Sequence, residues 1–115
     1  MPGVHKKLIF SFFRNKKILV IGGGDSACEE ALFLTSISDD VTLMHRRSEL
    51  KAQKAIQNKI SKNKKIKVIY DSEIVEIKGN NNVESVLVKN NKIFLYYIKS
   101  LTIYINLFNI GFNFT

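Results

Sequence analysis

Cysteine is almost absent from this sequence of 115 residues, in which Cys28 is the only thiol. A single thiol cannot form an internal disulfide, and the sequence has neither a C-x-x-C pair nor a Cys/His cluster with metal-ligand spacing. A disulfide-stapled module and a zinc domain are therefore excluded. Because 45% of the residues are hydrophobic, the chain can bury one core of ordinary size. We expect a single domain suited to a reducing compartment.

Acidic residues are also scarce, since 10 Asp and Glu stand against 18 Lys and Arg and give a formal net charge of +8. This excess favours anionic partners without specifying one, because net charge governs solubility and nonspecific association. The densest basic cluster has no aromatic residue between its lysines and is typical of a solvated rim, so we expect no nucleic-acid partner. It consists of Lys62, Lys64, Lys65 and Lys67.

A signal peptide is not expected. The N-terminal region is basic and has no acid before Asp25, but its apolar run at residues 8–10 is too short for a signal-peptide core. A mitochondrial presequence is the less favoured alternative, because such segments are also basic and poor in acids. This region has little serine and no clear amphipathic stripe. We therefore expect a cytoplasmic protein.

Charge is nearly absent from residues 93–115, where Lys99 is the only charged side chain. The segment approaches the length of a membrane span. Its β-branched and aromatic residues favour strands, and a lysine within lipid is costly, so a membrane helix is the less favoured reading. Three asparagines also interrupt it, at Asn106, Asn109 and Asn113. We expect no membrane partner and a strand pair that closes the domain.

Short aliphatic runs, by contrast, recur along the first part of the chain. They occupy residues 17–21, 41–44 and 66–70, and each is bounded by polar residues or glycine. Runs of this length with such boundaries predict buried strands.

Apolar residues at helical spacing predict two helices between these strands. The first is expected to start at Ser26 and to end near Thr35, because Ser26 and Glu29 form the S-x-x-E pattern of a capping box. Ser48 is expected to cap the second helix, over residues 49–62. Its inner face would carry Leu50, Ala55, Ile56 and Ile60.

The pattern changes after Asp71. Apolar and polar residues alternate on both sides of an asparagine-rich turn at residues 79–82, which predicts an antiparallel hairpin. Residues 92–97 follow a second Asn-Asn turn and are expected to add a third strand. The predicted fold class is α/β, a Rossmann-like βαβαβ parallel sheet with an antiparallel β-meander.

The pattern Gly22-x-Gly24-x-x-Ala27 lies between the first predicted strand and the first predicted helix. In this context Gly22 permits a tight turn, Gly24 lets the backbone approach a pyrophosphate, and Ala27 allows close packing of helix on strand. The helix N-terminus then offers free N–H groups to the anion. The alternative is a glycine turn without a ligand.

The second predicted strand ends in His45-Arg46-Arg47. A dinucleotide site specific for NADH would carry an acid there to hold the ribose 2′-hydroxyl, whereas arginine accommodates a 2′-phosphate. The sequence therefore favours NADPH over NADH, with Lys51 as a third cationic group. A solvated basic patch is the alternative for Arg46 and Arg47, and His45 either touches the phosphate or packs at the strand end.

Several segments carry a family resemblance: F-R-N-K at 13–16, V-I-G-G-G-D-S-A at 20–27, E-E-A at 29–31, F-L-T at 33–35, H-R-R at 45–47 and D-S-E-I-V-E at 71–76. They resemble the low-molecular-weight thioredoxin reductases, which are FAD-dependent flavoproteins of the pyridine nucleotide-disulfide oxidoreductase family. The likeness runs from Phe13 to about Lys89. It implies nucleotide binding, with NADPH as the cofactor, through Gly22, Gly23, Gly24, Asp25, Ser26, Ala27, His45, Arg46, Arg47 and Lys51. That family usually has arginine where this sequence has Lys51.

The resemblance implies a redox reaction in which a hydride passes from NADPH to FAD and electrons then pass through a dithiol to thioredoxin. In that family a C-x-x-C precedes F-R-N-K, but residues 5–11 contain no cysteine, and the flanking FAD-binding segments are also missing. Residues 107–112 only faintly resemble the strand that returns the chain to the flavin domain. Although Cys28 lies near a helix N-terminus, which lowers thiol pKa values, it has no resolving thiol. We expect a packing role for it and no catalytic residue.

The chain is thus expected to be an NADPH-binding domain that is inactive as an isolated fragment, with thioredoxin and a flavin domain as the partners implied by the resemblance. The expected organisation is a divergent N-terminal segment at 1–12, a core at 13–98 and a divergent C-terminal segment at 99–115, for which a closing strand is one reading. The alternative is a noncatalytic basic α/β binding or interaction protein, or a degenerate gene relic.

Overall fold

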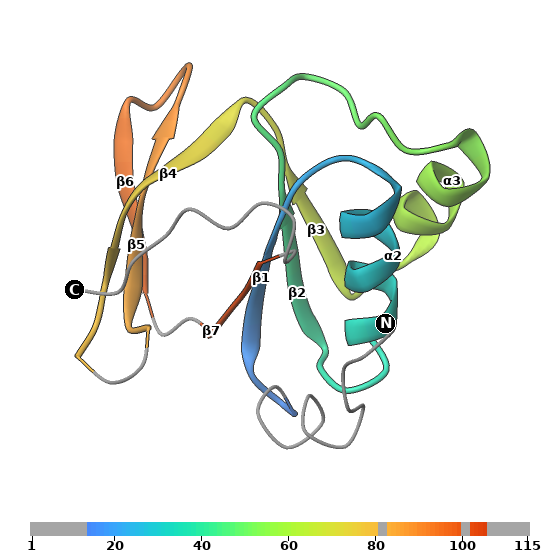
Figure 1. Ribbon diagram of the computed structural model, residues 1–115, viewed down its shortest axis with the longest axis horizontal. Helices are drawn as coiled ribbons and strands as arrows, with labels where there is room; N and C mark the ends of the chain where they lie inside the picture. The colour runs from blue at the N-terminus through green and yellow to red at the C-terminus, as the bar shows by residue number, and fades with distance from the viewer. Residues whose placement is uncertain (1–13, 81–82, 100–101, 106–115) are drawn as a thin grey trace.

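The computed structural model describes residues 14–80, 83–99 and 102–105, which form two sheets and two helices (Figure 1). The expected segments 1–12 and 107–112 lie outside these residues. In chain order the elements are β1 (Lys17–Ile21), α2 (Asp25–Leu34), β2 (Asp40–Met44), α3 (Lys54–Lys62), β3 (Ile66–Ile69), β4 (Ser72–Lys78), β5 (Ser85–Asn90), β6 (Leu95–Lys99) and β7 (Thr102–Ile105).

The first sheet is parallel, in the order β3-β2-β1-β7, and α2 and α3 cover one of its faces (Figure 1). Its central strand β1 is aliphatic throughout its middle because both of its faces are buried, and Ile18, Leu19 and Val20 have no exposed surface. The three aliphatic strands predicted from the sequence are confirmed. The chain has a Rossmann-like α/β fold.

The second sheet is antiparallel, in the order β4-β5-β6, and packs on the face of the parallel sheet opposite the helices (Figure 1). The predicted β-meander is therefore confirmed. Alternation along β1 sends Ile18 and Val20 into the core beneath the helices and Leu19 into a second core with Val86 and Val88 of the meander. The two cores hold the three layers together.

Both predicted helix starts are wrong. Helix α2 begins at Asp25 after the N-cap residue Gly24, and no side chain caps it, so Ser26 does not form the expected capping box. Helix α3 begins only at Lys54, and Ser48 is not its cap. On its inner side Ile60 is buried as predicted, whereas Ala55 is exposed and Ala52, just before the helix, is buried instead.

The part of the C-terminal stretch that the structure describes contains two strands, as expected, but they do not pair with each other. Strand β6 pairs with β5 in the meander, while β7 pairs in parallel with β1 and forms one edge of the parallel sheet. The two strands therefore extend different sheets. Within the described ranges, neither helix combines the length and the apolar character that crossing a bilayer requires.

Candidate functional site

The turn between β1 and α2 contains three glycines in three different surroundings. Gly22 has a φ of 134°, a conformation that residues with a side chain rarely adopt. Its N–H donates to the carbonyl of Met44, 2.9 Å away, which ties the turn to the end of β2. A side chain at this position would strain the backbone at the point where the chain leaves the sheet.

Gly23 is required because the ring of His45 lies directly against it. A Cβ atom at position 23 would be 2.5 Å from Cε1 and Nδ1 of that ring. His45 is itself buried, and burial lowers its pKa, with further lowering by the charges of Lys51, Arg47 and Arg46 and partial opposition from a backbone hydrogen bond involving Glu49. The neutral ring thus closes the turn against β2, and its Nε2 atom has no hydrogen-bond partner among the described residues.

Replacing Gly23 with alanine is expected to lower the free energy of unfolding by about 1–3 kcal/mol, the usual range for overpacking a core. Chemical denaturation measures this change. The double variant Gly23→Ala/His45→Ala provides the control, because removing the ring removes the clash and the two effects should be less than additive. Strict additivity would show that the ring and the glycine do not constrain each other.

Gly24 differs from its neighbours because no atom of the described residues occupies the space beside it. A Cβ atom there would meet no atom within 4 Å, and its φ of −87° suits any residue. The first turn of α2 follows directly, and no side chain caps its N–H groups. Open space in front of uncapped helical N–H groups can receive an anion, which the helix dipole also favours.

The loop between β2 and α3 is fastened across this turn by backbone hydrogen bonds. The carbonyl of Gly23 accepts from the N–H groups of Lys51 and Ala52, at 2.7 and 3.0 Å. The carboxylate of Asp25 accepts from the N–H of Gln53 at 2.8 Å. These contacts replace the first hydrogen bonds of a longer helix and explain why α3 begins late. Asp25 was expected to bind a cofactor. In the structure its carboxylate holds the loop before α3 by accepting the hydrogen bond from Gln53.

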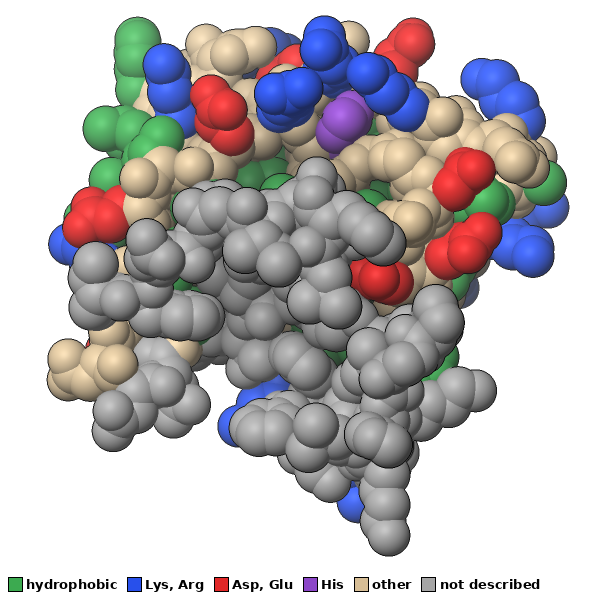
Figure 2. Space-filling model, in the orientation of Figure 1, with side chains coloured by type: hydrophobic (Ala, Val, Ile, Leu, Met, Phe, Trp, Pro, Cys, Tyr) green, Lys and Arg blue, Asp and Glu red, His purple; other side chains and the backbone are tan. Residues whose placement is uncertain are grey.

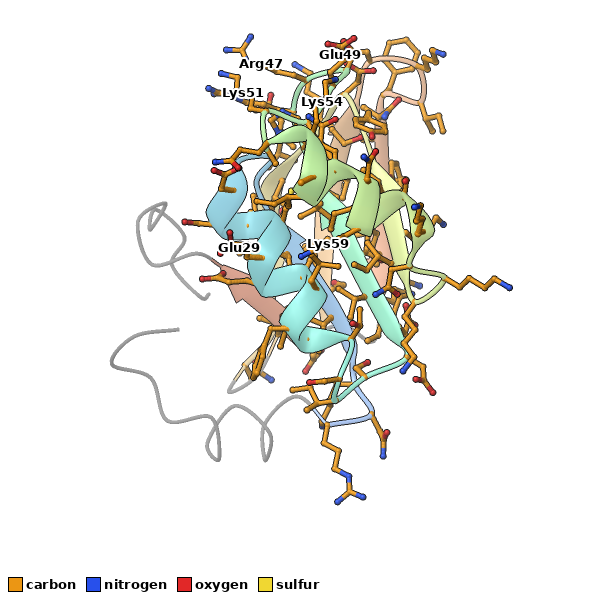
Figure 3. All side chains as sticks on the ribbon, turned by 90° about the vertical axis from the view of Figure 1, so that its right-hand side faces the viewer. Glu29, Arg47, Glu49, Lys51, Lys54 and Lys59 are labelled. Atoms are coloured by element: carbon orange, nitrogen blue, oxygen red, sulfur yellow. The ribbon has the colours of Figure 1, made fainter. Side chains whose placement is uncertain are left out.

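The same loop presents an excess of positive charge. Arg46, Arg47 and Lys51 are exposed, and none of them forms an ion pair within the part of the chain that the structure describes. Glu49 is the only acid among them, and Figure 3 shows it with Arg47 and Lys51 at one end of the molecule, beyond the helices. Basic side chains gather along this end (Figure 2). The region therefore attracts anions.

All ten predicted site residues lie at the carboxyl ends of β1 and β2, where parallel sheets of this type bind ligands. They divide into two groups. Those at the surface are Gly24, Asp25, Ser26, Arg46, Arg47 and Lys51, whereas Gly23, Ala27 and His45 are buried and Gly22 is half-buried. Ala52 and Gln53, whose backbone N–H groups hold the loop in place, were not predicted from the sequence. No local pattern marks such a role.

Cys28 faces the core beneath α2 and has no exposed surface. Burial, and then the carboxylates of Asp25 and Glu29, raise its pKa to about 11. The helix dipole therefore does not activate this thiol. Its predicted role in packing is confirmed.

The sequence of this chain resembles that of known proteins. The sequence profile described as "Pyridine nucleotide-disulphide oxidoreductase" matches residues 17–92. The chain is 49% identical to a thioredoxin reductase of Peptoclostridium litorale over 81 residues, which is 70% of this chain and 26% of the relative. A thioredoxin reductase of Dictyostelium discoideum is 49% identical over 80 residues, 70% of this chain and 25% of the relative.

Solved structures give the same result. The thioredoxin reductase of Streptococcus pyogenes MGAS5005 superimposes with a TM-score of 0.79 at 41% identity, covering 85% of this chain and 33% of that one. That of Lactococcus lactis gives a TM-score of 0.76 at 46% identity, covering 87% of this chain and 34% of that one. The chain spans about a quarter of the length of the curated relatives that it matches.

Proposed function

Because the chain belongs to the pyridine nucleotide-disulphide oxidoreductase family, we propose that it is the NADPH-binding domain of a thioredoxin-reductase-like flavoprotein. The observation that carries this proposal is the open space at Gly24, which faces the uncapped N-terminus of α2. A dinucleotide pyrophosphate needs close approach to backbone and free N–H donors, and this turn offers both. The residues present therefore fit the group.

Selection of NADPH over NADH is proposed to rest on the loop after β2. Arg46 and Arg47 have no ion pair among the described residues, so their guanidinium groups are free to bind a 2′-phosphate through charge-assisted hydrogen bonds. Lys51 would add a third charge. No carboxylate ends β2 to hold a 2′-hydroxyl, and His45 is proposed to support the turn by packing.

The proposed NADPH-binding core comprises residues 13–98. When bound, NADPH supplies a hydride, and the proposed reaction of the whole protein delivers it to FAD and then, as electrons, to thioredoxin. This chain's residues would bind and orient the nucleotide for that transfer. We propose a cytoplasmic location, because a lone buried thiol suits a reducing compartment.

Thermal unfolding tests the proposed function. A ligand that binds only the folded state at a hundred times its Kd stabilises that state by about 2.7 kcal/mol. NADPH at that excess should therefore raise the Tm of the purified chain by several degrees, and NADH at the same concentration should raise it less. If neither nucleotide changes the Tm, a noncatalytic α/β interaction protein becomes the better account.

The isolated chain is expected not to reduce thioredoxin or a chromogenic disulfide with NADPH, even with added FAD. Disulfide exchange needs a thiolate and a second thiol to resolve the mixed disulfide, whereas Cys28 is alone, buried and protonated at neutral pH. NADPH absorbance followed with wild type and Cys28→Ser should show the same background. Sustained oxidation that Cys28→Ser abolishes would make this thiol catalytic.

A further inference from the structure

A second candidate site lies on the opposite face of the parallel sheet, toward its amino end. On this face Leu19 and Met44 pack against the meander in an aliphatic core. Strand alternation places Lys17, Thr42 and Lys67 on the same face, nearer the amino ends of their strands. This face is therefore aliphatic toward the carboxyl ends of the strands and polar and basic toward their amino ends. A face that was covered along its whole length would be aliphatic throughout.

A cleft of about 410 Å³ opens between this basic half and strand β6. In Figure 1 the chain passes from β3 to β4 at the carboxyl end of the parallel sheet, and the two sheets lie side by side from there. We name the space the inter-sheet cleft and define it by six of its lining residues: Lys17, Thr42, Lys67, Tyr96, Tyr97 and Lys99. Its volume is within the range of about 300–1,000 Å³ found for small-molecule sites.

The charge of the inter-sheet cleft is positive. None of its three lysines forms an ion pair among the residues the structure describes. Asp40 is the register partner of Lys17 on the neighbouring strand, and register partners lie on the same face of a sheet. The nearby Asp39 is paired with Lys65 at 3.1 Å and does not neutralise the cleft. Lys17 and Lys67 share the cleft-facing side of the parallel sheet, whereas Lys99 alternates with the inward-facing Ile98 and lies on the outer face of β6. Two ammonium groups against one carboxylate favour an anionic ligand.

The kind of cation and the aromatic residues narrow the ligand class. Lysine binds phosphate as a point charge, and a phosphate group, with a charge of about −1.5 to −2, is attracted more strongly to two ammonium groups than a carboxylate is. Tyr96, on the inward-facing side of β6, adds apolar ring surface with a hydroxyl group, which suits an organic portion of the ligand. The hydroxyl of Tyr97 instead accepts a hydrogen bond from Lys78 at 3.0 Å. We propose that the inter-sheet cleft binds a small phosphorylated molecule, at a site separate from the Gly22–Ala27 turn.

Nuclear magnetic resonance of the full chain, titrated with inorganic pyrophosphate at constant ionic strength, tests this proposal. Saturable shifts are expected at the backbone amides of Lys17, Thr42 and Lys67. Lys67→Gln should weaken these shifts about tenfold in Kd, the change expected on losing one hydrogen bond to a charged group. Lys67→Arg, which keeps the charge and the fold, should bind within a few fold of wild type.

Lys62→Gln is the matched control, because Lys62 lies in the last turn of α3 and does not line the cleft. It removes the same charge and should leave the Kd at the cleft amides unchanged. Equal losses in Lys62→Gln and Lys67→Gln would reduce the effect to net charge and overturn the proposal. Shifts confined to the turn after β1 and the loop after β2, or no saturable shifts at all, would also overturn it.

Discussion

Alanine at both Arg46 and Arg47 is expected to remove the preference for NADPH over NADH. Each guanidinium can contribute a charge-assisted hydrogen bond of about 1.5–3 kcal/mol. Because both side chains are exposed, we expect about 2–4 kcal/mol in total after screening. NADH, which has no 2′-phosphate, should bind the double variant as it binds wild type. Calorimetric titration of both nucleotides measures the difference.

A control variant separates this local effect from the loss of net charge. Lys59 and Lys62 lie in the last turn of α3, and Figure 3 shows Lys59 well away from the end that carries Arg47. Lys59→Ala/Lys62→Ala removes the same two charges and should keep the NADPH preference. A preference that survives in Arg46→Ala/Arg47→Ala would move the 2′-phosphate to another part of the surface.

Valine at Gly24 is expected to abolish dinucleotide binding and to leave the chain folded. The Cβ of the new side chain would meet no atom of residues 14–80, 83–99 and 102–105 within 4 Å and needs no unusual φ, so the side chain enters the space proposed for the pyrophosphate. A branched apolar residue at an N-cap position costs about 1 kcal/mol, and the Tm should therefore fall only slightly. Calorimetric titration and thermal unfolding monitored by circular dichroism measure the two properties separately.

Gly23→Ala provides the contrast, since its side chain meets the ring of His45 and lowers stability directly. The two variants alter neighbouring positions. Gly24→Val is expected to lose nucleotide binding with little loss of stability, whereas Gly23→Ala is expected to lose stability directly. If Gly24→Val binds NADPH as tightly as wild type, the space at this turn is not the pyrophosphate site.

The strands could be predicted from the sequence because each depends on a local property. Residues 17–21 form a continuous aliphatic run, and β1 has the same bounds because it is buried on both faces. The alternation after Asp71 likewise predicted the hairpin, since β4 and β5 have one inward face each. Periodicity within a few residues contains this information.

The helix starts could not be predicted in the same way. Ser48 and Ser26 have the residue types of caps, but the loop after β2 is held by bonds to Gly23 and Asp25, more than twenty residues earlier in the chain. Tertiary contacts of this kind override local capping preference. The loop therefore stays extended across the turn, and α3 begins only after Gln53.

The candidate site was found from the spacing of its glycines and from the basic end of β2, because both features are local. The packing of His45 on Gly23 could not be found from such local features, since it depends on how β1 and β2 meet at their carboxyl ends. The sequence thus predicted which residues gather at this edge. Gly24 was expected to leave room for a pyrophosphate, and packing was one of two readings of His45, but the contact of the His45 ring with Gly23 could not be predicted.

Calorimetric titration of the unmodified chain with NADPH and with NADH tests the central claim most directly. The proposed function predicts saturable binding of one NADPH per chain and NADH binding weaker by at least about tenfold, a difference of 1.4 kcal/mol. Equal affinity for the two nucleotides would contradict the role given to Arg46 and Arg47. Absence of binding by NADPH would contradict the claim that this chain is an NADPH-binding domain.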